Sequence, residues 1–135
     1  VACAAALAVH QKIERLDLLS SVRSQGKALM DKLQARFGNN PYVGDIRGRG
    51  LFQGIEFVSD RLTKEPFDPA HKLHARIKKH AFEAGLICYP GGATADGVRG
   101  DHVLLAPPFI INDAQLDELV DKLAHAIDLS LGEIT

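Results

Sequence analysis

Residues 85–111, GLICYPGGATADGVRGDHVLLAPPFII, carry the clearest fold signal in the chain. Two short apolar runs, residues 86–89 and 103–106, predict strands, and a glycine-rich loop with one arginine joins them. Pro107 and Pro108 end the second strand, because proline has no N–H to donate to a ladder. Such a loop places a few polar groups at the edge of a sheet, where small molecules commonly bind.

Upstream, residues 2–37 contain a single glycine and no proline, which predicts one long helix or two helices in tandem. Gly38 and Pro41 predict the end of this helical segment. Apolar residues at three-, four- and seven-residue intervals predict its buried stripe: Leu19, Val22, Leu29 and Leu33.

Residues 43–47 and 51–58 predict two further strands, joined by a turn in which two glycines flank an arginine. Ile55 and Phe57 alternate with small or polar residues, as expected for a strand with one buried face. The glycine spacing is not that of a dinucleotide-binding loop, and a strand follows it rather than a helix N-terminus. We therefore interpret the glycines as allowing a tight turn and the close approach of a neighbouring element.

Two more helices are indicated by their capping residues. Asp68 followed by Pro69 predicts a helix start, and Gly85 predicts where that helix ends. Asn112, with Gln115 three residues later, predicts a capping box at the start of the last helix. The order of elements predicts an α+β fold with a small antiparallel or mixed sheet of about four strands. We expect helices packed on one face of this sheet and a long helical segment before it.

Length and composition limit the classes of function. A chain of 135 residues with a formal charge of −1 predicts one domain, without the basic surface that binds nucleic acid or an anionic membrane. Residues 2–9 are apolar but too few to span a bilayer, and no basic flank indicates a secretory signal. Cys3 and Cys88 do not make a disulfide framework, so we expect a cytoplasmic protein. The alanine-rich opening resembles a helix already under way, which favours a fragment of a longer chain.

Arg99 is the candidate ligand-binding residue of the glycine-rich loop. It is flanked by Asp96 and Asp101, and a guanidinium can bind a ligand carboxylate through two parallel hydrogen bonds. The alternative is a salt bridge to one of these two aspartates that only stiffens the loop. The sequence leaves both interpretations open.

The histidines and hydroxyl residues predict no further chemistry. His71 and His74 lie three residues apart on a predicted helix, but no third ligand stands at a matching position, so we expect no metal site. We interpret these histidines as surface residues of an amphipathic helix. No serine, cysteine or threonine stands on a sharp turn with a histidine partner, so no nucleophilic triad is predicted.

Four segments, in order, resemble the C-terminal part of the class III, pyridoxal-phosphate-dependent aminotransferases. They are VACAAALAV at residues 1–9, VGDIRGRGL at 43–51, DRLTKEPF at 60–67 and GDHVLLAPPFII at 100–111. The resemblance implies a fold type I homodimer that moves an amino group between an amine or amino acid and a keto acid. It also implies a helical connection at residues 1–37, leading from a large domain into a small C-terminal domain at residues 38–135.

The resemblance implies a division of labour between these domains. In such enzymes a lysine of the large domain holds pyridoxal phosphate as a Schiff base, and the small domain closes over the site. We therefore expect no catalytic, cofactor-binding or metal-binding residue in this chain, and no transamination by the chain alone. The lysines agree, because they fall on charged helix faces or in a polar loop, and a Schiff-base lysine needs a pocket that lowers its pKa. The alternative is a stand-alone, non-catalytic α+β binding or regulatory module.

The resemblance also suggests which residues face the substrate. Leu104 and Tyr89 occupy positions at which some relatives carry a carboxylate-binding arginine, so Arg99 is the remaining candidate for a substrate carboxylate. Tyr89 and Leu104 then suit an apolar or aromatic part of an amine. This pattern favours an amine–pyruvate type of substrate pair over an ornithine-like one.

Overall fold

The computed structural model describes residues 1–135 and is an α+β fold built on one four-stranded antiparallel sheet. In chain order the elements are α1 (Ala2–Arg15), α2 (Leu18–Phe37), β1 (Val43–Arg49), β2 (Phe52–Phe57), the short 3₁₀ helix η1 (Pro69–His71), α3 (Leu73–Glu83), β3 (Tyr89–Gly91), β4 (Asp101–Leu105) and α4 (Asp113–Gly132). The expected α+β class is confirmed. Of the two sheet types that the sequence left open, the antiparallel one is found.

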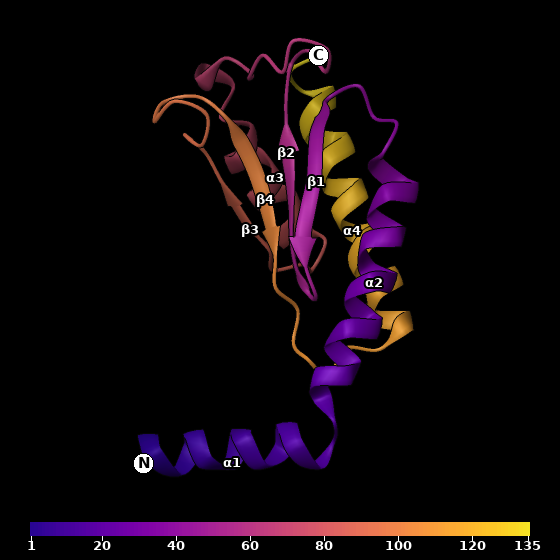
Figure 1. Ribbon diagram of the computed structural model, residues 1–135. Coiled ribbons are helices and arrows are strands. Elements are labelled where there is room, and N and C mark those ends of the chain that lie inside the picture. The colour runs from indigo at the N-terminus through magenta and orange to yellow at the C-terminus, as the bar shows by residue number, and fades with distance from the viewer.

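The sheet has one covered face and one open face. Its strand order is β1-β2-β4-β3, so β2 and β4 are central and β1 and β3 are edges. Helices α2, α3 and α4 pack against one face, and α1 stands away from the sheet (Figure 1). On the open face Phe52 and Tyr89 are 58% and 72% exposed.

The core lies between the covered face and the three helices. Ile55 on β2 and Val103 on β4 point into it and are fully buried, which confirms the expected alternation along β2. From α2, Leu29 and Leu33 reach the same core, as the apolar stripe predicted. Leu19 was expected in that stripe but is 55% exposed, whereas its neighbour Leu18 is 8% exposed, so the first turn of α2 buries Leu18 instead.

The turn between β1 and β2 touches α2 through two glycines. A Cβ added to Gly26 would lie 2.4 Å from the carbonyl carbon of Gly50. Gly50 has a φ of 57°, which side chains rarely adopt, and a Cβ there would meet Val22. The interpretation of the turn glycines as a tight connection with a close neighbour is therefore confirmed.

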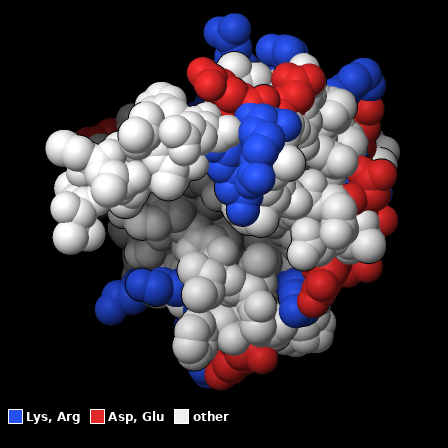
Figure 2. Space-filling view, turned by 90° about the horizontal axis from the view of Figure 1, so that it is seen from below, with Lys and Arg blue, Asp and Glu red and all other residues white.

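Helix α1 is separated from α2 by a sharp break at Asp17, whose φ of 45° is left-handed. Two helices in tandem are therefore found, rather than one long helix. None of the residues of α1 is buried, and Leu7 and Val9 are exposed. Seen from below, α1 projects from the body, and the surface beside it is hollowed and carries few charged side chains (Figure 2). Neither α1 nor any other helix has the length and apolar character needed to cross a bilayer.

Two predicted boundaries differ from the structure. The strand expected at residues 86–89 begins only at Tyr89 and runs through Pro90. An edge strand tolerates proline, because the backbone groups on its outer side have no neighbouring strand to bond. Leu86 is instead partly buried beside the core. The helix expected to start at Pro69 is a single 3₁₀ turn, and α3 starts after Lys72, whose φ of 50° interrupts the helix.

Candidate functional site

The open face of the sheet carries a row of directly opposed residues, one from each strand. Arg47 on β1 faces Gly54 on β2, Gly54 faces Leu104 on β4, and Leu104 faces Tyr89 on β3. Directly opposed residues point to the same side of a sheet. The sequence-predicted residues Tyr89 and Leu104 are therefore neighbours on the face that no helix covers.

A shallow cavity of about 290 Å³ lies on this face. Leu104 and Phe52 supply apolar surface, and Gly54 leaves room between them. Arg47, Glu56, Thr94 and His102 supply the polar groups that line it. Neither Tyr89 nor Arg99 lines this cavity, so the structure does not gather all three predicted residues in one pocket.

The charges around this cavity are mostly paired. Arg47 Nη1 lies 2.7 Å from a carboxylate oxygen of Asp45 and 2.7 Å from one of Glu56. These hydrogen bonds, first to Glu56 and then to Asp45, raise the pKa of Arg47. One arginine thus stands between two carboxylates.

His102 forms the uncharged part of the polar lining. Burial lowers the pKa of His102, which favours the neutral imidazole at neutral pH. Its ring lies against Gly91, where an added Cβ would be 2.7 Å from Cε1 of the ring. Its buried Nδ1 has no hydrogen-bond partner in the chain.

Arg99 lies in the loop between β3 and β4 and is held by two carboxylates. Its Nε donates to Asp96 at 2.7 Å, and its Nη1 donates to Glu65 at 2.5 Å. The backbone N–H of Arg99, its side chain and the N–H of Val98 together lower the pKa of Asp96 to about 2. Of the two salt bridges considered from the sequence, the one to Asp96 forms and the one to Asp101 does not.

Asp101 has a different partner. It is a buried carboxylate, 4% exposed, at the start of β4. Its Oδ1 accepts a hydrogen bond from the backbone N–H of His74 at 3.0 Å and lies 2.5 Å from Nδ1 of the same histidine. Asp101 therefore joins the end of the Arg99 loop to the first turn of α3.

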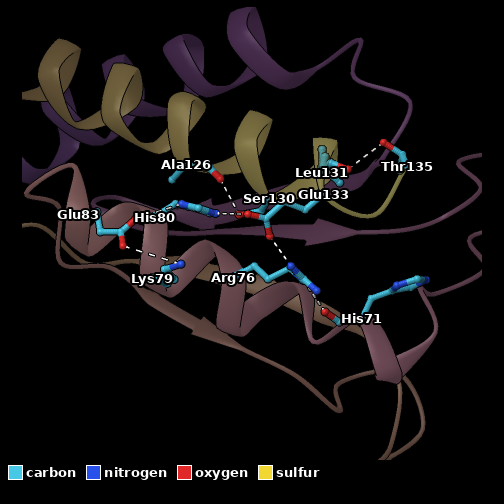
Figure 3. A network of polar contacts seen from close by, with 10 residues as sticks. All are labelled: His71, Arg76, Lys79, His80, Glu83, Ala126, Ser130, Leu131, Glu133 and Thr135. Atoms are coloured by element: carbon cyan, nitrogen blue, oxygen red, sulfur yellow. Dashed lines mark hydrogen bonds and ion pairs between the residues drawn. The ribbon is translucent and has the colours of Figure 1, made fainter.

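The other helical histidines have structural partners. His80 Nε2 lies 2.9 Å from Glu133 at the end of α4, and Arg76 forms an ion pair with the same carboxylate (Figure 3). Arg76 and then His80 lower the pKa of Glu133, so this carboxylate stays charged between α3 and α4. His71 lies on η1 rather than on the helix of His74, so the expected three-residue spacing on one helix is wrong.

Sequence reasoning missed the contributions of Glu65, Glu56 and His102. Glu65 meets Arg99 from 34 residues away in the chain, and no local pattern indicates that contact. Glu56 and His102 are directly opposed on β2 and β4, a pairing that follows from the strand register. The alternation along each strand was the only signal that could place them on the same open face.

Comparison with known proteins identifies the family. The model of the family described as "Aminotransferase class-III" matches residues 1–127. The chain belongs to the class III aminotransferases. Among curated relatives, an uncharacterized aminotransferase of Schizosaccharomyces pombe is 50% identical over 134 residues, which cover 99% of this chain and 29% of the relative.

Two further relatives show how much of a longer aminotransferase this class III chain covers. A taurine–pyruvate aminotransferase of Bilophila wadsworthia is 36% identical over 96% of this chain and 28% of its own length. A crystal structure of a pyridoxal-phosphate-bound aminotransferase mutant from Vibrio fluvialis is 34% identical, with a TM-score of 0.78 over 87% of this chain and 24% of its own. The chain thus spans less than a third of the length of each of these proteins.

The family implies pyridoxal phosphate, which needs a lysine with a neutral amine, and the lysines of this aminotransferase chain do not provide one. Lys27, Lys32, Lys79 and Lys122 pair with carboxylates. The hydrogen bond that Lys32 donates to Asp117 raises the pKa of Lys32, whereas attack on an aldehyde needs a neutral amine and a lowered pKa. Lys64 donates to the Gly44 carbonyl, and the remaining lysines are exposed: Lys12, Lys72 and Lys78.

The N-termini of α3 and α4 do not fit the cofactor phosphate either. A phosphate binds where the N–H groups at a helix start are free. At α3 the N–H of His74 is already bonded to the Asp101 carboxylate, whose charge would also repel a phosphate. At α4 the N–H of Gln115 is bonded to the Asn112 side chain, in the capping box that the sequence predicted. Neither the lysines nor these two helix N-termini therefore fit pyridoxal phosphate.

Proposed function

We propose that this chain is the substrate-side, C-terminal domain of an aminotransferase that moves an amino group between an amine or amino acid and a keto acid such as pyruvate. The observation that carries the proposal is the family match over residues 1–127, combined with relatives that are more than three times as long. The name of the taurine–pyruvate relative supports an amine–pyruvate pair of substrates. Within the proposed protein, residues 1–37 connect to a large domain and residues 38–135 form the small domain.

In this proposal the large domain supplies the cofactor and the lysine that holds it. Pyridoxal phosphate, when bound there, supplies the electron sink for amino-group transfer. The environments of the lysines described above support a lysine from outside this chain. We further propose a cytoplasmic homodimer, and we expect the isolated residues 1–135 to be inactive.

The proposed task of this chain is to recognise the substrate. Arg99 is the group with the right chemistry for a carboxylate, since a guanidinium offers parallel N–H donors. Its present partners, Glu65 and Asp96, are exposed carboxylates, and exposed ion pairs contribute little stability, so a substrate carboxylate can compete with them. Tyr89 and Leu104 offer adjacent apolar surface for the rest of an amine substrate.

Steady-state kinetics of the full-length protein that contains this chain test the role of Arg99. In Arg99→Gln we expect KM for pyruvate to rise about 10- to 100-fold, because a charge-assisted hydrogen bond to the carboxylate is lost. KM for an amine without a carboxylate should stay unchanged. Arg36→Gln is the matched control, because Arg36 is a half-exposed arginine paired with Asp128 and far from the loop in sequence. Equal KM values for pyruvate in Arg99→Gln and in the wild type would contradict the proposed role.

A labelling experiment tests the division of labour. The full-length protein is incubated with pyridoxal phosphate, reduced with borohydride and mapped by mass spectrometry. We expect the modified lysine to lie outside residues 1–135. Specific modification of one lysine within this chain, with loss of activity on its replacement by arginine, would overturn the proposal.

A further inference from the structure

Helix α3 does not cap its own N-terminus. Its N-cap residue is Lys72, which makes no capping hydrogen bond from its side chain, and its first turn contains no acidic residue. The missing acceptor comes from Asp101, 27 residues further along the chain, which binds the N–H of His74 at 3.0 Å. A carboxylate at a helix N-terminus is favoured both as an acceptor and by the helix dipole.

The same two residues close the base of the loop that carries Arg99. Asp101 follows the loop directly, after Gly100, whose φ is 101°. At the other end of the loop Gly92 lies against the His74 ring, and an added Cβ would be 2.8 Å from its Nδ1. His74 therefore touches the chain where the loop begins and, through Asp101, where it ends.

The loop between these two ends is held to itself by the backbone. The N–H of Ala95 donates to the Arg99 carbonyl at 2.9 Å, and the N–H of Thr94 donates to the Gly100 carbonyl at 3.4 Å. These two hydrogen bonds join the two arms of the loop, so the arms and the Arg99 backbone move together. Whatever fixes Gly100 and Gly92 therefore fixes the backbone of Arg99, from which its guanidinium extends.

Burial decides which of the anchors dominates. At the tip of the loop, Arg99 and Glu65 are 43% and 57% exposed, and an ion pair of this kind is weak. At the base, the Asp101 carboxylate is almost fully buried, so losing its partner leaves an uncompensated buried charge. The base contact therefore holds the loop even when Arg99 releases Glu65.

From this geometry we infer that Asp101 and His74 are a positioning pair, which holds the loop of residues 92–100 and thereby sets the place of Arg99. Neither residue touches the substrate in this arrangement. The part of the inference that concerns substrate recognition rests on the proposed function, whereas the part that concerns the loop does not. Replacement of Asp101 should therefore change two separate quantities, loop protection and substrate KM.

Amide hydrogen exchange in the full-length protein tests the loop. In Asp101→Ala we expect exchange at the Thr94 and Ala95 amides to become about tenfold faster or more, because the base of the loop opens. Asp101→Asn keeps an acceptor for the His74 N–H and should recover part of this protection. Glu133→Gln is the control, because it removes a carboxylate that holds α3 from the α4 side and leaves the loop untouched. Unchanged exchange at both amides in Asp101→Ala would overturn the inference.

Kinetics of the same variants separate positioning from a general loss of stability. We expect Asp101→Ala to raise KM for pyruvate about tenfold while kcat and KM for an amine without a carboxylate change less than about twofold. Merely structural damage would lower kcat for all substrates in one proportion and would overturn the inference. So would an unchanged KM in Asp101→Ala beside a raised KM in Arg99→Gln.

The two proposals fail in different ways. If exchange rises in Asp101→Ala but Arg99→Gln leaves KM for pyruvate unchanged, the role of Arg99 in the proposed function is wrong and the loop anchor stands. A double-mutant cycle with His74→Ala completes the test. His74→Ala should remove less protection in the Asp101→Ala background than in the wild type, because the two side chains share one contact, and equal losses in both backgrounds would overturn the pairing.

Discussion

At Gly26 the packing of α2 on the β1–β2 turn leaves no room for a side chain, because an added Cβ would lie 2.4–2.5 Å from backbone atoms of Gly50. We expect Gly26→Ala to lower the free energy of unfolding by about 1–3 kcal/mol, since packed backbones must move apart. This loss outweighs the gain of about 1 kcal/mol that alanine brings to a helix interior. Urea unfolding measures the change. Gly132→Ala is the control, because nothing lies within 4 Å of its added Cβ, and equal effects in both variants would contradict the prediction.

Asp96 gives a prediction for pH at the scale of one residue. Its pKa is lowered from 3.8 to about 2 by the Arg99 N–H, the Arg99 side chain and the Val98 N–H. A lowered folded-state pKa means that these contacts stabilise the fold above pH 3.8 and lose that contribution as the pH falls toward about 2. A carboxyl NMR titration should give a midpoint of about 2 for Asp96.

The side chain of Arg99 is the second of these causes, so Arg99→Gln should move the midpoint only part of the way back toward 3.8. Arg61→Gln removes a different loop arginine, which bonds the Asn40 carbonyl, and should leave the midpoint unchanged. A midpoint of 3.8 in the wild type would mean that the loop does not hold Asp96 in this way.

For single residues, the sequence predicted which chemical groups can form contacts better than it predicted which residues those groups contact. The guanidinium and its neighbouring Asp96 are adjacent in the chain, so their salt bridge could be considered in advance. Glu65 and Asp101 find their partners across 34 and 27 residues. Those contacts depend on how loops and elements meet in space, which no local pattern encodes.

For the elements, the capping box predicted at the start of the last helix is confirmed. The Asn112 side chain accepts from the Gln115 N–H, and the Gln115 side chain accepts from the Asn112 N–H. We expect Asn112→Ala to lower the free energy of unfolding by about 1 kcal/mol, because an N-terminal N–H of α4 loses its acceptor. Thermal unfolding measures the change. Asn39→Ala, at an exposed site after α2, is the control, and a loss of the same size there would argue against a capping effect.

Element boundaries failed where local preference competes with tertiary contacts. Apolar residues 86–88 resemble a strand, but Leu86 and Cys88 pack beside the core without a strand partner. Periodicity alone does not distinguish these two environments in a short run. The interruption at Lys72 has a similar origin, since its left-handed φ has no glycine or proline to announce it.

Across the whole molecule, α1 has no buried residue, and its apolar residues Leu7 and Val9 are 60% and 58% exposed. In the full-length protein we expect this helix to be covered, so Leu7→Ala should lower the free energy of unfolding by about 2 kcal/mol or more. Leu62→Ala is the control, because Leu62 is 94% exposed in the polar segment between β2 and η1. Denaturant unfolding of the full-length protein compares the two. Equal, small effects would mean that α1 is not buried by other polypeptide.

The α+β class followed from the order of elements. Only the structure shows that the sheet is antiparallel rather than mixed, and that the first helical segment is two helices rather than one. Helices on one face of the sheet were also predicted and are found, but the sequence did not indicate which residues meet on the uncovered face. Strand alternation distinguishes two faces but does not say what lies against each of them. The row from Arg47 to Tyr89 emerges only once the strand order is known. The domain boundary at residue 37 stays a prediction.

Because α1 extends away from the bend at Asp17, a small rotation at that bend moves the far end of α1 by a large distance. A helix of 14 residues is about 21 Å long, so a rotation of about 10° at the bend displaces its far end by about 4 Å. Because α2 is anchored to the β1–β2 turn at Gly26, the rotation passes to the sheet as a rigid body. A rotation at one left-handed residue thus changes the direction of α1 relative to the sheet, without any rearrangement of the core.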